Sequence, residues 1–478
     1  MMERRVDVAI IGAGTAGLFA LRQVKRFTDS YVVIDGGQLG TTCARVGCMP
    51  SKVMIKTAED YHHRHALAAE GIAGGDRLGI EAPEAMAYVQ RMRDSFVEHV
   101  MGGPVSKLGD KLIRSHARFR AQGEIEVDGG VVRAERVIVA TGSRPVLPRA
   151  WQAFGDRVIT TDQVFEQSSL PQSMAVLGLG VIGLELGQAL ARLGVEVTGI
   201  DMLQRLGGLS DETVNETAVA AMRREFPVWL GEKAELAEGM DGRIRVTAGA
   251  KSVEVEQVLV AAGRKPNADR LGLDQLGVEL DRRGVPTYDP ETMKVPGEPI
   301  FIAGDANADL PLQHEARDEG QIAGYNAARG TEQRFRRRAP LAIVFSQPNV
   351  VTVGESWATL QHQDVLVGTC RFEGDQRSRI KHADSGIARI YADRRDGRLR
   401  GASMVAPDGE HLGHLFALAI QQGLTAADVL RMPFYHPTTE ERVQDALREI
   451  ANNTEQQLDQ PVDLEFLDHD ERQVRAAE

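Results

Sequence analysis

The chain has 478 residues, of which 42% are hydrophobic and 26% charged, and its formal net charge at pH 7 is -12. This length predicts two to four domains, and the composition is that of a globular protein, neither disordered nor fibrous. The acidic balance argues against nucleic acid as a partner, because a phosphate-binding face needs clustered Lys and Arg. The one basic run, Arg334 with Arg336, Arg337 and Arg338, is predicted to be a solvated connection between domains.

Cysteine usage and hydropathy predict where the protein resides. Three cysteines are too few for a disulfide-stapled secreted scaffold. The first five residues carry no signal-peptide pattern and lead straight into a strand. No apolar stretch reaches the roughly 20 residues that span a bilayer. The sequence therefore predicts a soluble, cytoplasmic protein that does not associate with membranes.

The chain opens with one complete βαβ pattern. A β-branched run at 6–11 precedes a glycine turn, a helical stretch at 18–27 and a strand at 31–34. The turn and the acid that closes the second strand supply Gly12, Gly14, Gly17 and Asp35. This order of elements is typical of a dinucleotide-binding unit.

The same pattern returns with a strand from Met174, a helix at 184–193 and a strand at 195–200. Its glycines and acid are Gly178, Gly180, Gly183 and Asp201. The first glycine precedes the acid by 23 residues in both copies (12 to 35 and 178 to 201). A single GxGxxG could mark a plain tight turn, but two copies with matched spacing indicate that one chain binds two dinucleotides.

Other segments complete the fold prediction. Residues 53–110 are predicted to be helical, and 111–140 to form short strands. Two related segments, 137–145 and 258–266, each end a strand in a glycine turn, and a strand near Phe301 ends in Gly304-Asp305. After about residue 340, short strands and then helices predict a separate α+β domain. The fold class is therefore α/β, with two Rossmann-like domains followed by an α+β domain.

Cys43 and Cys48 stand in the run Gly-Thr-Thr-Cys-Ala-Arg-Val-Gly-Cys-Met-Pro-Ser-Lys, which begins at Gly40. Four intervening residues at a helix start allow the two sulfurs to come within bonding reach. A helix N-terminus also lowers the pKa of a thiol, which favours redox chemistry. A dithiol beside a dinucleotide is suited to moving two electrons at a time.

A metal site and a static disulfide are the alternatives for this cysteine pair. The nearest additional ligands, His62, His63 and His65, have a helix-face spacing and are predicted to be solvated, so no metal is expected. The third cysteine, Cys370, is predicted to be a small buried residue.

This ordered set of motifs resembles the pyridine nucleotide-disulfide oxidoreductases, homodimeric FAD enzymes that include lipoamide dehydrogenase, glutathione reductase and mercuric reductase. The resemblance covers nearly the whole chain and, within the family, is greatest to the lipoamide dehydrogenases. It implies an FAD-binding domain at 1–150 and 267–338, an NAD-binding domain at 151–266 and a dimerisation domain at 339–478.

The resemblance also implies the residues of each site. The FAD site would comprise Gly12, Gly14, Gly17, Asp35, Thr42, Lys52, Thr141, Gly142, Gly304 and Asp305. The NAD site would comprise Gly178, Gly180, Gly183, Asp201 and Gly263. The catalytic residues would be Cys43, Cys48, Lys52, Glu185, His436 and Glu441.

Roles follow from the same resemblance. Cys43 is the thiol that exchanges with substrate, and Cys48 is the thiol against the flavin. Lys52 and Glu185 match positions that form an ion pair near the flavin. The alternative, from the sequence alone, is that each is a charge on a helix surface.

The C-terminal motif supplies the base. His436 would remove a proton from the substrate thiol, because the thiolate is the nucleophile, and Glu441 would orient the imidazole. The alternative is that His436 is only a turn residue before Pro437. In the family this segment reaches the partner's disulfide, which implies a homodimer with shared active sites.

Three residues depart from the family pattern. Thr41 stands where the family usually has a second glycine, and Asp35 replaces the commoner glutamate. Tyr435 precedes the histidine where lipoamide dehydrogenases usually have His-Ala-His. The changes at Thr41 and Asp35 remove no donor or acceptor that the chemistry requires. At Tyr435 the base is retained but its surroundings differ, so the small disulfide acceptor could be a lipoyl group on an unusual carrier protein.

The predicted function is dihydrolipoyl dehydrogenase: oxidation of a protein-bound dihydrolipoyl group with NAD+ through FAD and the Cys43–Cys48 disulfide. Asp201 favours NAD over NADP because a carboxylate accepts from the ribose 2′-hydroxyl and repels a 2′-phosphate, although Arg205 lies nearby. The alternative enzyme is an NAD(P)H-dependent reductase of a small disulfide. A flavin-binding structural subunit would have lost the thiols or the His–Glu pair, and both are present.

Overall fold

The computed structural model describes residues 2–383, 385–456 and 460–465. Its contacts divide the chain into two compact units, each assembled from separate stretches. Unit 1 comprises Met1–Thr57, Gly79–Pro171 and Gln257–Arg337, and unit 2 comprises Ala58–Leu78, Gln172–Glu256 and Arg338–Glu478. The end of the predicted dimerisation domain, 466–478, lies outside the described residues.

Unit 1 is built on a sheet with the order β3-β2-β1-β6-β5-β4, in which β17 also pairs with β6. Its strands are β1 (Met2–Ile11), β2 (Tyr31–Ile34), β3 (Leu112–Ile113), β4 (Arg118–Ala121), β5 (Glu124–Val127), β6 (Gly130–Val139) and β17 (Ile300–Ile302). β1, β2, β6 and β17 run parallel. Their near-continuous β-branched sequences suit a sheet buried on both faces.

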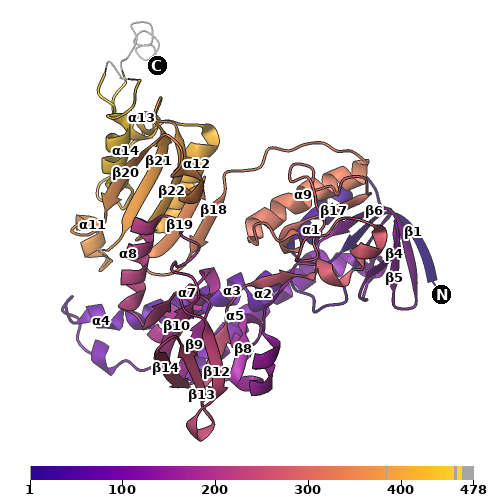
Figure 1. Ribbon diagram of the computed structural model, residues 1–478, viewed down its shortest axis with the longest axis horizontal. Helices are drawn as coiled ribbons and strands as arrows, with labels where there is room; N and C mark the ends of the chain where they lie inside the picture. The colour runs from indigo at the N-terminus through magenta and orange to yellow at the C-terminus, as the bar shows by residue number, and fades with distance from the viewer. Residues whose placement is uncertain (1, 384, 457–459, 466–478) are drawn as a thin grey trace. The chain divides into compact units, whose positions relative to one another are not determined.

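Helices α1 (Thr15–Val24) and α9 (Gln313–Arg329) pack together beside this sheet (Figure 1). They approach closely because a Cβ at Gly320 would lie 2.3 Å from the Ala16 carbonyl oxygen, which leaves room only for glycine. α1 begins three residues before the predicted start, because extended Gly14 is its N-cap and the glycine turn leads directly into the helix.

The other α-helices and strands of unit 1 lie outside this sheet. They are α2 (Thr42–Val46), α3 (Cys48–His62, which ends in unit 2), α5 (Ala82–Val100), α6 (Thr161–Val164), β7 (Ser143–Pro145), β8 (Val158–Thr160), β15 (Gln257–Val260) and β16 (Arg264–Pro266). β7 and β16 pair antiparallel, so the two related glycine segments of the sequence lie side by side.

Unit 2 contains the second nucleotide-binding pattern. The parallel strands are β9 (Ser173–Leu177), β10 (Glu196–Asp201) and β11 (Val228–Leu230), and the helices are α4 (Arg64–Leu67), α7 (Val181–Arg192) and α8 (Glu212–Arg223). An antiparallel sheet follows, formed by β12 (Ala234–Glu238), β13 (Ile244–Ala248) and β14 (Lys251–Val255).

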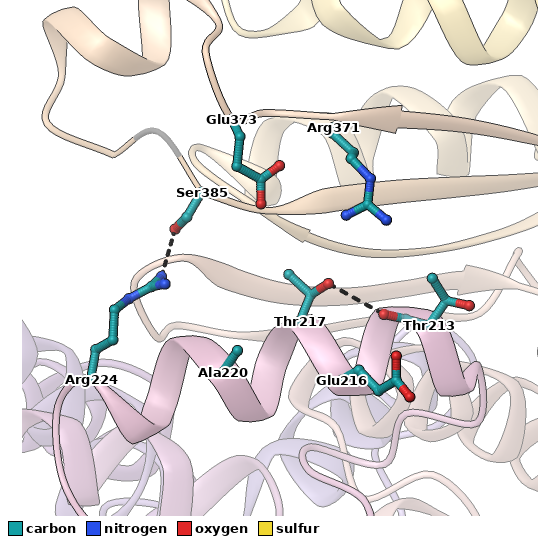
Figure 2. A pocket seen from close by; sticks show the side chains of 8 residues that line it. All are labelled: Thr213, Glu216, Thr217, Ala220, Arg224, Arg371, Glu373 and Ser385. Carbon is teal, nitrogen blue, oxygen red and sulfur yellow. Dashed lines mark hydrogen bonds between the residues drawn. The ribbon is translucent and has the colours of Figure 1, made fainter.

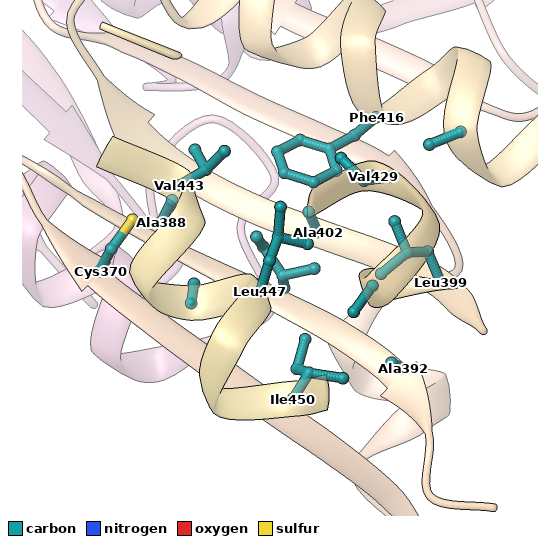
Figure 3. Close-up of a cluster of buried hydrophobic side chains, with 14 of the residues drawn as sticks. Cys370, Ala388, Ala392, Leu399, Ala402, Phe416, Val429, Val443, Leu447 and Ile450 are labelled. Atoms are coloured by element: carbon teal, nitrogen blue, oxygen red, sulfur yellow. The ribbon is translucent and has the colours of Figure 1, made fainter. Parts of the chain in front are cut away.

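The C-terminal part of unit 2 is an antiparallel sheet with the order β18-β19-β22-β21-β20. Its elements are β18 (Leu341–Val344), β19 (Asn349–Gly354), α10 (Trp357–Leu360), β20 (Val365–Arg371), α11 (Gln376–Ile380), β21 (Ile387–Asp393), β22 (Leu399–Ala406), α12 (Gly409–Gln422), α13 (Ala426–Leu430) and α14 (Val443–Ala451). Leu447 and Phe416 pack into one apolar core with Cys370 (Figure 3). Cys370 is 3% exposed and burial raises its pKa to about 12, so its prediction as a buried small residue is confirmed.

One buried carboxylate fixes α8 against the C-terminal sheet. Asp211 caps the helix by accepting from the Val214 N–H and is fully buried. Arg389 and the Tyr391 hydroxyl donate to the same carboxylate at 2.7 and 2.6 Å. Since each donor is satisfied, the nucleotide-binding and C-terminal parts of unit 2 are held together by a buried ion pair.

Candidate active site

The carboxyl ends of the parallel strands in unit 1 meet at one edge of the sheet. β1, β2, β6 and β17 end immediately before Gly12, Asp35, Ala140 and Ala303. In open α/β sheets, ligands bind outside this edge. The predicted FAD residues that follow these strands are therefore brought together by the fold.

The first glycine turn has the shape that a dinucleotide requires. Gly12 has φ +111°, and a Cβ at Gly17 would lie 1.9 Å from the Gly12 carbonyl oxygen, so both positions require glycine. A Cβ at Gly14 would meet nothing within 4 Å, so open space lies where α1 begins. Free N–H groups at a helix start attract a pyrophosphate, and this space admits one.

Asp35 ties the strand end to the turn. Its Oδ2 accepts from the Ala13 N–H at 2.7 Å and its Oδ1 accepts from the Gly37 N–H at 2.8 Å. The shorter aspartate thus retains the position of an acid beside the turn, and each oxygen keeps a second lone pair for a ribose hydroxyl.

Asp305 lies in the short helix η8 (Gly304–Asn307), and its Oδ2 is held by a hydrogen bond. The Ser143 hydroxyl donates to Asp305 Oδ2 at 2.6 Å, and Arg264 donates to the same hydroxyl at 2.8 Å. The nearby Thr141 Oγ1 is buried and has no hydrogen-bond partner. An unsatisfied buried hydroxyl beside a fixed carboxylate fits a polar ligand chain such as the ribityl group of FAD.

Ser143, Arg264 and Asn267 contact the predicted FAD residues and were not predicted from the sequence. Asn267 donates to the Thr141 carbonyl at 2.9 Å, and its own N–H donates to the Gly142 carbonyl at 2.9 Å. The sequence contains one signal for these contacts, because the 137–145 and 258–266 segments are related, but it does not show that the two segments pair. Gly142 and Gly263 have φ +66° and +103°, so both turns require glycine.

Unit 2 repeats the nucleotide turn. Gly178 has φ +96°, a Cβ at Gly183 would lie 1.8 Å from the Gly178 carbonyl oxygen, and a Cβ at Gly180 would meet nothing within 4 Å. Asp201 Oδ2 accepts from the Leu179 N–H at 2.6 Å, as Asp35 does from Ala13. The two turns therefore share one geometry, which fits a second dinucleotide.

Cys43 and Cys48 lie in contact, and no disulfide joins them in this structure. Cys43 is in the first turn of α2, and Cys48 is the first residue of α3. The hydrogen bond to Cys48, followed by burial, raises the pKa of Cys43, whereas the charge of Lys52 acts to lower it. This direction is opposite to the lowered pKa that the sequence predicts for a thiol at a helix N-terminus.

Gly47 permits this contact. A Cβ at position 47 would lie 3.2 Å from Cys43 Cα and 3.0 Å from the Thr42 carbonyl oxygen, tighter than most real contacts. The glycine therefore lets the start of α3 pass close to α2. Thr42, the predicted cofactor residue between Thr41 and Cys43, is exposed at the start of α2.

Thr41 is in a backbone conformation that favours glycine, with φ +63° and ψ +147°. A β-branched residue is rarely found there, which explains why a glycine would suit this position. The Thr41 hydroxyl accepts from the Ala44 N–H at 3.2 Å and so caps α2. The helix that carries Cys43 is thus capped by a strained residue.

We expect Thr41→Gly to be more stable than Thr41→Ala by about 1 kcal/mol, because both variants lose the cap and only glycine relieves the backbone strain. Chemical denaturation of the two proteins would measure this difference. Equal stability, or a more stable alanine variant, would show that the conformation is not strained.

Lys52 and Glu185 belong to different units. Lys52 is half-buried on α3, and its ammonium lies 3.4 Å from the Ser51 hydroxyl. Glu185 is only 5% exposed and its Oε1 accepts from the Phe345 N–H at 3.0 Å, so it is not a charge on a helix surface. The ion pair between them stays a prediction.

His436 and Glu441 lie together in unit 2. His436 Nδ1 is 3.2 Å from both carboxylate oxygens of Glu441, and the Thr438 N–H donates to Oε2 at 3.0 Å. The imidazole is 72% exposed, whereas the Glu441 side chain is 28% exposed. With Nδ1 held by the carboxylate, Nε2 is left to face a substrate.

The three neighbouring histidines differ in their exposure. His63 and His65 are exposed, and His62 is half-buried, so solvation is right for two of the three. Burial and the charge of Arg192 lower the pKa of His62. Among the described residues no group of three or more His, Cys, Asp or Glu side chains could hold a metal ion.

A hollow of about 260 Å³ in unit 2 contains none of the predicted site residues (Figure 2). Arg224 and Arg371 line it together with Glu216 and Glu373, so its charges are mixed and indicate no single ligand class. Over the described ranges, no helix combines the length and apolar character needed to cross a membrane.

Two dinucleotide turns, a contacting thiol pair and a His–Glu pair define a class of protein, the dithiol oxidoreductases that use two nucleotides. The sequence matches the family model for pyridine nucleotide-disulphide oxidoreductases over residues 6–320, and that for their dimerisation domain over 341–447. The chain belongs to this family.

Individual relatives agree. The chain is 32% identical to a dihydrolipoyl dehydrogenase of Halobacterium salinarum over 464 residues, covering 92% of this chain and 95% of the relative. It is 29% identical to the Geobacillus stearothermophilus dihydrolipoyl dehydrogenase, covering 94% and 96%. LpdA from Mycobacterium tuberculosis shares the fold with a TM-score of 0.80 at 24% identity, covering 93% and 99%. The predicted fold class and family are confirmed, and the protein is an FAD-dependent disulfide oxidoreductase similar to the dihydrolipoyl dehydrogenases.

Proposed function

We propose that the protein oxidises a protein-bound dihydrolipoyl group with NAD+, using Cys43 and Cys48 as its redox-active pair. The contact between these thiols at two adjacent helix starts is the observation that supports this best. The substrate class comes from the Halobacterium salinarum and Geobacillus stearothermophilus relatives, which are both dihydrolipoyl dehydrogenases.

We propose the following thiol exchange. His436 Nε2 removes a proton from one thiol of the substrate, and the resulting thiolate attacks Cys43 Sγ of the oxidised pair and displaces Cys48 as a thiolate. The second substrate thiol then attacks the first substrate sulfur, which releases Cys43 and closes the lipoyl disulfide. Two electrons and two protons leave the substrate, and the enzyme disulfide becomes a dithiol.

FAD, when bound, would accept these two electrons from the dithiol and supply hydride to the nicotinamide. The residues proposed to hold FAD are the first glycine turn, Asp35, Thr141 and Asp305. The open space at Gly14 and the unsatisfied hydroxyl of Thr141 fit FAD. We propose that Lys52 pairs with Glu185 beside the flavin.

NAD+ is the proposed acceptor. Asp201 is fixed at the end of β10 by the N–H groups of Leu179 and Leu203, at 2.6 and 2.8 Å. Its carboxylate would accept a hydrogen bond from a ribose 2′-hydroxyl and repel a 2′-phosphate. A homodimer is proposed because the chain carries the family's dimerisation domain. The four-segment domain division and the cytoplasmic location stay predictions.

Steady-state turnover of free dihydrolipoamide with NAD+ and NADP+ tests the proposal, and a lipoyl carrier protein tests its natural form. We expect turnover with both thiol substrates and a higher kcat/KM for NAD+. No dihydrolipoamide turnover with either nucleotide, together with reduction of a small disulfide by NADPH, would support the alternative reductase.

A further inference from the structure

Unit 1 contains a buried acid that the proposed mechanism does not use. Glu319 on α9 is 0% exposed, and burial raises its pKa. Its Oε2 accepts from the Gly304 N–H at 2.7 Å and from Asn307 Nδ2 at 2.8 Å. These two donors are the ends of η8, the short helix that carries Asp305. Glu319 therefore holds the backbone immediately before the proposed FAD ligand Asp305 and the side chain of Asn307 two residues after it.

Arg337 is the counter-ion of this acid. Its Nη2 donates to Glu319 Oε1 at 3.0 Å and to Glu315 Oε2 at 2.5 Å, and its Nη1 donates to the Pro290 carbonyl at 3.2 Å. Arg337 is the last residue of unit 1 and belongs to the basic run. The prediction that this run is solvated is wrong for Arg337, because its side chain is only 23% exposed. Arg337 turns inward to pair with the two buried carboxylates of Glu315 and Glu319.

Charge compensation gives Arg337 more than a packing role. Glu315 and Glu319 lie four residues apart on α9, so both carboxylates lie on one face of the helix. Their side chains are 7% and 1% exposed, and an unpaired buried charge is costly. Without Arg337, Glu319 would have to take up a proton or turn away from Gly304. Either response loosens the backbone at Asp305.

The turn itself has little freedom to adjust. Gly304 has φ +69°, and a Cβ there would lie 3.0 Å from Ala16 Cβ and 3.2 Å from Ala316 Cβ. Asp305 is already fixed through Ser143 at its side chain, so Glu319 supplies the matching restraint on its backbone. Both restraints act on the carboxylate that would meet the ribityl chain.

We propose that Arg337 is a positioning residue of the FAD site, which acts through Glu319 on the Gly304–Asp305 turn. This inference rests on the proposed function only in so far as Asp305 binds FAD. Arg337 stands at the start of the segment that joins the two units, so this segment would help to hold the cofactor.

Reconstitution of the apoprotein tests this assignment. We expect Arg337→Met to bind FAD about 10- to 100-fold more weakly than the wild type, the loss seen when outer contacts of a metal ligand are removed. The dissociation constant would be measured by quenching of FAD fluorescence, and the visible circular dichroism of the bound flavin would be recorded. Arg337→Lys should bind with intermediate affinity, because an ammonium cannot form the same fork.

Arg336 offers a matched control. It is the adjacent residue of the same run and is exposed. We expect Arg336→Met to bind FAD as the wild type does. The variant Glu319→Gln and its combination with Arg337→Met complete a double-mutant cycle, in which the two losses should be less than additive because both act through one contact.

An Arg337→Met protein that binds FAD with wild-type affinity and dichroism would overturn the inference, even if its thermal stability fell. If Arg337→Met does not fold, Arg337→Lys and Glu319→Gln decide the question in the same assay, and wild-type FAD affinity in both would overturn it. A wild-type protein that binds FAD but does not oxidise dihydrolipoamide would contradict the proposed substrate and leave the inference standing.

Discussion

Replacing Cys43 by serine should abolish the oxidation of dihydrolipoamide, with kcat falling by on the order of 10⁴-fold or more, since removal of an attacked nucleophile or sulfur leaves only residual catalysis. The physical reason is that a hydroxyl oxygen cannot form the exchangeable bond to Cys48 that accepts the electron pair. Dihydrolipoamide-dependent NADH formation, followed by absorbance, measures the effect. FAD should remain bound, because the first glycine turn, Asp35, Thr141 and Asp305 lie on other elements than Cys43.

Two controls separate loss of the redox pair from loss of the fold. Oxidation of NADH by ferricyanide needs the flavin and nucleotide sites but no thiol, so it should continue in Cys43→Ser. Cys370→Ser changes the same atom in the core of the C-terminal sheet and should retain dihydrolipoamide turnover. Substantial dihydrolipoamide turnover by Cys43→Ser would show that the electrons take another route.

Replacing His436 by glutamine should lower kcat for dihydrolipoamide by about 10²- to 10⁴-fold, the usual contribution of a positioned general base. The remaining rate should rise with pH, because the substrate thiol must then ionise without help. Initial rates across a pH series would show this steeper dependence. Binding of FAD should be unchanged, since His436 belongs to the other unit.

Glu441→Gln should reduce the same rate by a smaller factor, because the amide can still contact Nδ1 but carries no charge to stabilise the imidazolium. His362→Gln is a matched control, since His362 is an exposed histidine of the same C-terminal domain. Wild-type rates and an unchanged pH profile in His436→Gln would mean that His436 is only the turn residue before Pro437.

The sequence predicted the elements that repeat a known pattern and missed contacts between distant segments. The strand at 31–34 is predicted at its observed bounds, because β-branched residues and flanking polar residues mark both ends. The sequence also predicts a helix at 439–452, whereas the structure begins this segment as η9 (Glu440–Arg442), a tighter 3-10 turn, and continues it as α14. Helix ends depend on caps, which single residues such as Gly14 decide.

The missed site residues share one physical cause. Ser143, Arg264 and Glu319 act only through partners more than ten residues away, and no local periodicity reports such contacts. The roles of Gly47 and Thr41 were missed for a different reason. These roles depend on backbone angles and close approaches, which a sequence does not display. Arg337 reads as solvated in a basic run, and only the fold places two carboxylates beside it.

Counting thiols under denaturing conditions tests the central claim most directly. The chain has three cysteines, so the oxidised enzyme should yield one reactive thiol, from Cys370, and the enzyme reduced anaerobically by dihydrolipoamide should yield three. Adding NAD+ to the reduced enzyme should return the count to one as NADH appears. A count that stays at three after NAD+, or one that never changes with dihydrolipoamide, would contradict electron transfer through Cys43 and Cys48.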